Sequence, residues 1–134
     1  MTTSNIKYQG NLRTKAVHLK SSSMIITDAP TDNQGKGEAF SPTDIVATAL
    51  GSCMLTIIGL KAREHKIDVE NISINVTKIM ESNPRKISEI IIEFDFLEKK
   101  YSDKEQTIIK NSAKSCPVAL SLDQKIKQTL IFNF

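Results

Sequence analysis

The uncharged run from Ile45 to Leu60 is the feature that most limits what this chain can fold into. It is shorter than the roughly 20 apolar residues that a membrane-spanning helix needs. It also contains Gly51, Ser52 and Gly59. We therefore expect a buried helix at the centre of the fold and no membrane partner.

The start of this helix is marked by its local sequence. Ser41 is a good N-cap, Pro42 suits the first helical position, and Asp44 in the first turn complements the helix dipole. The helix is apolar on every face until about Lys66, so each face needs cover, and one sheet in a small domain covers only one. A symmetric second copy is the commonest solution, so we expect a homodimer.

The other expected elements are recognised from alternating apolar residues and from helix-start signals. In chain order they are extended structure over 6–19 and 24–27, hairpin strands over 69–80 and 87–97, a helix opened by a capping box at 102–105, a short helix from 117, and a closing strand over 126–134. This order predicts an α+β fold with antiparallel sheets around a long central helix. A length of 134 residues suits one domain, 1–134.

Composition and local motifs exclude several classes of function. The net charge is only +3, and acidic and basic residues are mixed along the chain, so no nucleic-acid partner is expected. The polar N-terminus has no apolar stretch typical of a signal peptide, which predicts a cytoplasmic protein. His18 and His65 lack ligand partners at zinc-site spacing, so we expect neither a metal nor another cofactor.

Cys53 and Cys116 are the only cysteines, and they are either buried structural thiols or a redox pair. Cys53 lies more than three turns into the expected helix, beyond the reach of the helix dipole, and apolar surroundings raise the pKa of a thiol. A reactive Cys53 therefore needs a cation from elsewhere. The candidates are Arg13, Lys15, Lys36 and Arg63, of which Arg63 is too far along the same helix. Cys116, at a predicted helix start, is the more acidic thiol by local sequence alone.

Three segments resemble the OsmC/Ohr family, the osmotically inducible and organic-hydroperoxide-resistance proteins. They are Gly35–Ile45, Ala49–Cys53 and Ser115–Val118 with Leu120–Ser121 behind it. The resemblance covers the whole chain, and the order of the expected elements agrees with it. It implies an OsmC-like fold in which two chains intertwine as a homodimer, with active sites near the subunit boundary.

The same resemblance implies a thiol-dependent peroxidase that acts on organic hydroperoxides. Cys53 is then the peroxidatic residue that becomes sulfenic acid, and Cys116 resolves it into a disulfide. An external dithiol, often lipoyl, reduces the pair, and Arg13 polarises the first thiol.

One position departs from the family pattern. The peroxidases carry a glutamate directly after the helix-start proline, where this chain has Thr43. Glu38 in the preceding loop is our expected substitute for holding Arg13, with Asp44 as the other possibility. Two alternatives stay open on the residues alone: an OsmC-like redox-sensing or small-molecule-binding protein without efficient turnover, and an inert dimer with two packed thiols.

Overall fold

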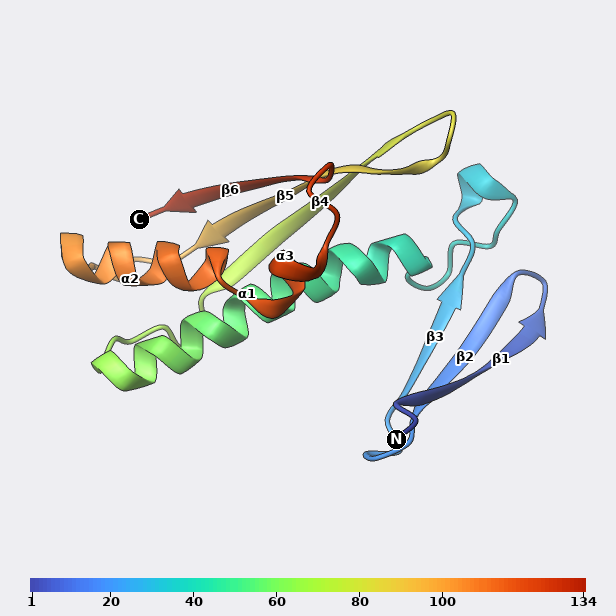
Figure 1. Ribbon diagram of the computed structural model, residues 1–134, viewed down its shortest axis with the longest axis horizontal. Coiled ribbons are helices and arrows are strands. Elements are labelled where there is room, and N and C mark those ends of the chain that lie inside the picture. Colours follow the sequence, from blue (N-terminus) through green and yellow to red (C-terminus); the bar gives the residue numbers. More distant parts are fainter. The chain divides into compact units, whose positions relative to one another are not determined.

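The computed structural model describes residues 1–134, which form two compact units, 1–46 and 47–134 (Figure 1). The elements, in order, are β1 (Ser4–Gly10), β2 (Arg13–His18), β3 (Met24–Asp28), a 3₁₀ turn (Thr31–Asn33), α1 (Pro42–His65), β4 (Ser73–Glu81), β5 (Lys86–Asp95), α2 (Asp103–Lys114), α3 (Pro117–Ser121) and β6 (Lys127–Asn133). The predicted α+β class with a long helix is confirmed. The single domain expected from length stays a prediction.

The first unit holds the antiparallel sheet β1-β2-β3. The sequence predicted one extended stretch over 6–19, but the chain reverses inside it. Gly10, Asn11 and Leu12 all have positive φ, at 83°, 53° and 61°. Glycine and asparagine tolerate this conformation, and such a turn matches the twist of a tight hairpin. The dipeptide Gly10-Asn11 was the signal for this turn.

The start of α1 is held by reciprocal hydrogen bonds between Ser41 and Asp44. The Asp44 backbone N–H donates to Ser41 Oγ at 3.1 Å, and the Ser41 backbone N–H donates to Asp44 Oδ2 at 3.0 Å. This is a capping box with aspartate in the place of glutamate. The predicted helix start at Pro42 is confirmed.

The second unit packs α1, α2 and α3 on one face of the sheet β4-β5-β6 (Figure 1). On β5, Ile90, Ile92 and Phe94 are fully buried, and they share a core with Leu50 and Met54 of α1. Full burial of each such side chain contributes about 1.5–3 kcal/mol. The hairpin β4-β5 therefore has one core face and one wet face, as its alternating sequence predicted.

The closing strand β6 runs parallel to β5, with Ile92 opposite Leu130 and Phe94 opposite Phe132. The expectation of wholly antiparallel sheets is wrong for this pair. Parallel neighbours need a long crossover, and α2 and α3 between β5 and β6 form it. The rings of Phe94 and Phe132 stack with centroids 4.6 Å apart, which pins the register of the pair.

The long helix α1 has two different sides. Leu50, Met54 and Ile58 are at most 1% exposed, whereas Val46 and Leu60 on other faces are 36% and 47% exposed. α1 is long and apolar enough to cross a membrane, with a mean hydropathy of 1.8 over its most apolar 18 residues. Core helices of soluble proteins can have the same length and hydropathy. The packing of one face in the core confirms a core helix, and the other faces remain open in one chain.

Candidate functional site

The second unit brings the two cysteines together. Cys53 lies on α1 and is half-buried, while Cys116 is the N-cap residue of α3 and is 0% exposed. Both are free thiols, and they lie close enough for the Cys53 thiol to raise the pKa of Cys116. Residues far apart in sequence thus form one thiol pair, in which Cys53 is partly exposed and Cys116 is fully buried.

The surroundings of Cys116 work against its ionisation. Burial is the largest influence and raises the pKa of the Cys116 thiol, and the neighbouring Cys53 thiol raises it further. The Ala119 backbone N–H donates to Cys116 Sγ at 3.3 Å and lowers the pKa, but by less than burial raises it. The helix start therefore does not make Cys116 acidic, and the inference drawn from local sequence is wrong.

The first unit contains an ion-pair cluster around Arg13. Arg13 Nε donates to Asp28 Oδ1 at 2.7 Å, and Nη2 donates to Oδ2 at 2.8 Å. Asp28 Oδ2 also accepts the Glu38 backbone N–H at 3.1 Å. The two side chains meet because Arg13 of β2 and Asp28 of β3 are directly paired across the sheet. This forked contact fixes the guanidinium plane.

The electrostatics of the cluster follow from these contacts. The hydrogen bond from Arg13 is the largest cause that lowers the pKa of Asp28, whose side chain is only 1% exposed. The same hydrogen bond raises the pKa of Arg13, which is therefore charged at all working pH values. The two hydrogen bonds to Asp28 hold the Arg13 guanidinium rigidly. Arg13 also keeps 32% of its side chain exposed, so the cation is still open to a reactant.

The predicted partner of Arg13 is its minor one. Glu38 Oε1 lies 3.9 Å from Arg13 Nη2, and the Glu38 side chain is 65% exposed. The main partner, Asp28, was missed by the sequence reasoning, although it directly follows the strand predicted over 24–27, which pairs with the strand of Arg13. Glu38 contributes chiefly through its backbone N–H. The Asp44 carboxylate, for its part, accepts the Ser41 N–H at the helix start.

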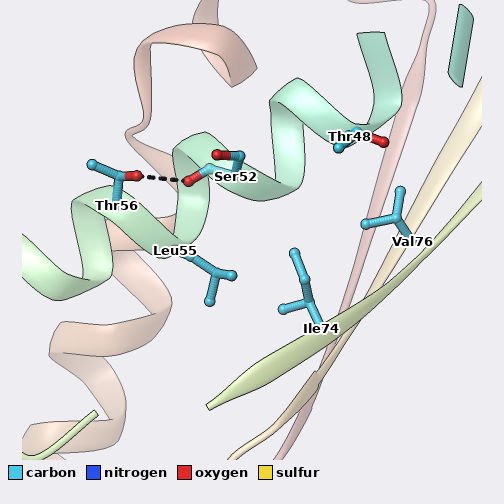
Figure 2. A pocket seen from close by; sticks show the side chains of 6 residues that line it. All are labelled: Thr48, Ser52, Leu55, Thr56, Ile74 and Val76. Carbon is cyan, nitrogen blue, oxygen red and sulfur yellow. Dashed lines mark hydrogen bonds between the residues drawn. The ribbon is translucent and has the colours of Figure 1, made fainter. Parts of the chain in front are cut away.

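A groove of about 470 Å³ opens between α1 and β4 (Figure 2). Its lining side chains are hydroxyl-bearing or aliphatic: Thr48, Ser52, Leu55, Thr56, Ile74 and Val76. Close approach of the helix to the strand is permitted by Gly51, since a Cβ there would lie 2.5 Å from Ile74 Cδ1. The groove is lined by neither thiol and by no ionisable group, so it belongs to the open side of α1 rather than to the thiol pair.

The histidines have ordinary surroundings. His18 Nδ1 and Ser21 Oγ are 2.6 Å apart at an exposed turn, and His65 lies in the last turn of α1, where a positive charge suits the helix dipole. Neither histidine is needed to explain the chemistry of the thiol pair.

A family model described as OsmC-like protein matches residues 35–130, which include both cysteines. The chain belongs to the OsmC-like family. A crystal structure from Psychrobacter arcticus 273-4, named for osmotic stress induction and detoxification response, is 55% identical to this OsmC-like chain. The match has a TM-score of 0.95 and covers 99% of this chain and 96% of that one.

Two more distant OsmC-like folds carry names that refer to hydroperoxides. An organic hydroperoxide resistance protein OsmC from Legionella pneumophila is 15% identical, with a TM-score of 0.78 and coverage of 100% of this chain and 98% of that one. An organic hydroperoxide resistance protein from Elizabethkingia anophelis is 14% identical, with a TM-score of 0.72 and coverage of 99% and 96%. At these identities the likeness shows the fold alone. A search of the curated proteins finds no significant match.

Proposed function

We propose that this protein is a thiol-dependent peroxidase that reduces organic hydroperoxides through Cys53 and Cys116. The observation that carries the proposal is that a half-buried thiol on α1 lies close enough to a fully buried thiol at the start of α3 to raise its pKa. Membership of the OsmC-like family supports it, as do the Legionella and Elizabethkingia proteins named for organic hydroperoxide resistance.

The different exposure of Cys53 and Cys116 decides which thiol attacks the hydroperoxide and which resolves the sulfenic acid in this proposal. The Cys53 thiolate attacks the hydroperoxide, the O–O bond breaks, and Cys53 becomes sulfenic acid. The departing alkoxide takes a proton from solvent and leaves as an alcohol. The Cys116 sulfur then attacks the sulfenic sulfur, the S–O bond breaks, and water leaves as the disulfide forms. An external dithiol, such as that of a lipoyl group, returns both residues to thiols and is itself oxidised to a disulfide. Because Cys116 is fully enclosed, it suits an internal partner and not a bulky peroxide.

Arg13 is the proposed activator of Cys53. A thiol deep in an apolar helix ionises only beside a positive charge, and a forked guanidinium supplies that charge in a fixed direction. Asp28 grips the guanidinium at 2.7 and 2.8 Å, with Glu38 as a second and weaker carboxylate at 3.9 Å. The pair of carboxylates takes the place of the glutamate that the peroxidases carry at the position of Thr43.

The protein is a homodimer in this proposal. In one chain Val46 and Leu60 of α1 are exposed, and the groove of Figure 2 lies open along the same helix. In the first unit, Ile6 and Ile25 lie in one row across the sheet and are 62% and 52% exposed. Monomers rarely leave apolar surface of this extent in water, and a second copy supplies apolar faces of the same kind.

A second candidate function is an OsmC-like redox sensor or binding protein whose thiols oxidise without efficient turnover. The observation that favours it is Thr43 in place of the glutamate expected after Pro42. The two functions share the thiol pair and differ in whether the disulfide is reduced fast enough for a catalytic cycle.

One assay separates the candidates. Consumption of cumene or t-butyl hydroperoxide is measured against that of hydrogen peroxide, with lipoamide or dithiothreitol as reductant and Cys53→Ser as the control. We expect many turnovers with organic hydroperoxides, fewer with hydrogen peroxide, and none in the control. A single turnover that stops at the disulfide favours the sensor, and no consumption favours two inert structural thiols.

A further inference from the structure

The short helix that follows Cys116 is held by the packing of Val118 and Ala119 against the core and by few hydrogen bonds to other elements. α3 spans only Pro117–Ser121, and none of its residues is fully buried. Its own bonds are local: Ser121 Oγ donates to the Pro117 carbonyl at 2.7 Å, and the Ala119 N–H donates to Cys116 Sγ at 3.3 Å. One turn of helix has no independent stability, so its position depends on contacts with neighbouring elements.

Gln128 of β6 provides the one hydrogen bond that joins α3 to another element. Its Nε2 donates to the Ala119 carbonyl at 3.0 Å, and the bond is partly buried. Ala119 is therefore held at both of its backbone groups, by Gln128 at the carbonyl and by Cys116 Sγ at the N–H. The sheet thus fixes the residue that orients the Cys116 sulfur, and this sulfur lies close enough to Cys53 for the two thiols to influence each other.

We propose that Gln128 is a positioning residue that aligns Cys116 for disulfide closure with Cys53. The inference rests on the proposed function, because closure is the second step of that mechanism. In the step itself the Cys116 sulfur bonds to the Cys53 sulfenic sulfur and the S–O bond breaks. The oxygen leaves as water with its own proton and the proton of the Cys116 thiol.

Disulfide closure competes with overoxidation of Cys53, and this competition makes the role of Gln128 measurable. A Cys53 sulfenic acid that waits for Cys116 can react with a second hydroperoxide and become sulfinic acid, which the external dithiol does not reverse. Slower closure therefore appears as a larger sulfinic fraction at Cys53. A residue that only stabilised the fold would leave this fraction unchanged at temperatures far below the melting transition.

The variants are chosen to separate positioning from stability. Gln128→Met keeps the length of the side chain and removes the donor. Gln128→His keeps an N–H donor at the same number of bonds from Cβ, and is the rescue variant. Gln106→Met is the matched control. Gln106, on α2, makes a bond of the same kind, in which its Nε2 donates to the Tyr101 carbonyl at 3.3 Å, and this bond involves neither thiol. Gln128→Asn, whose amide is too short to reach, replaces Gln128→Met if that variant fails to fold.

Two measurements are made on the full-length protein, both read by mass spectrometry. The first is the ratio of disulfide to sulfinic acid after treatment with cumene hydroperoxide. The second needs no peroxidase activity: Cys53 is converted to its glutathione mixed disulfide with glutathione disulfide, and the rate of closure by Cys116 with release of glutathione is followed. We expect Gln128→Met to slow closure about 2- to 10-fold in both, the factor that one neutral hydrogen bond is worth.

The outcomes are distinct. Slow closure in Gln128→Met, wild-type closure in Gln106→Met and recovery in Gln128→His support the inference. Closure at the wild-type rate in Gln128→Met, or equal slowing in Gln106→Met, overturns it. If the wild-type protein forms no sulfenic acid with hydroperoxide while the glutathione experiment shows the Gln128 effect, the proposed function fails and the positioning role stands.

Discussion

Placing a carboxylate in the groove between α1 and β4 tests how the open side of the central helix is covered. Ser52 lines this groove and is exposed in one chain (Figure 2). If the protein were a monomer, Ser52→Glu would be almost neutral. Glutamate is the better helix former by a few tenths of a kcal/mol, and its charge would stay in water.

The dimer predicts a much larger effect. A carboxylate buried without a partner costs several kcal/mol, and two-fold symmetry buries two of them. Taking about 3 kcal/mol per chain gives about 6 kcal/mol per dimer, which weakens the dissociation constant about 10,000-fold. Because the wild-type monomer exposes so much apolar surface, we expect the released chains to lose their fold as well.

The assay is sedimentation equilibrium at micromolar protein, with circular dichroism on the same samples. Asn111→Glu, at an exposed position of α2, is the matched control and should behave as wild type. A wild-type protein that sediments as a folded monomer of 14.9 kDa, or a Ser52→Glu protein that remains a dimer of wild-type stability, would refute the reasoning.

Three further predictions concern the charged cluster and the thiols. Arg13→Ala should slow the reaction of Cys53 with cumene hydroperoxide in stopped-flow experiments by about tenfold or more, because the proposed cation that favours the thiolate is lost. Arg13→Lys should restore only part of the rate, because an ammonium lacks the fork that Asp28 holds. The pKa of Asp28 is lowered in the folded protein from its usual 3.8. The ionised carboxylate therefore stabilises the fold above that pH, and this stabilisation is lost as the pH falls further. The difference in free energy of unfolding between wild type and Asp28→Asn, measured with urea, should shrink from pH 7 to pH 3. Cys116→Ser should fold normally, because serine is a better N-cap for the Ala119 N–H, yet mass spectrometry should find sulfinic acid at Cys53 in place of the disulfide.

Features set by neighbouring residues could be predicted from the sequence. Ser41, Pro42 and Asp44 mark the start of α1 because capping is decided within one turn, and the same holds for the capping box of Ser102 and Glu105 at α2. The core face of β5 was also predictable, since alternation in a strand depends only on which residues are apolar.

Features set by distant pairing were missed or misjudged. Asp28 became the main partner of Arg13 through the register of β2 and β3, which no short stretch of sequence reveals. The separate turn at Asn11, between β1 and β2, was also overlooked. The local view of Cys116 as an acidic thiol failed because the effect of burial in the core on its pKa outweighs that of the backbone N–H groups at the helix start. Contact between Cys53 and Cys116 was expected only through the family resemblance, since no local pattern links α1 to α3.

The most direct test of the central claim is peptide mapping of the protein after one equivalent of cumene hydroperoxide, under conditions that block thiol exchange. The account predicts an intramolecular disulfide between Cys53 and Cys116 in the wild-type protein, and an unmodified Cys116 thiol in Cys53→Ser. Two free thiols after treatment, or a disulfide only between chains, would contradict it.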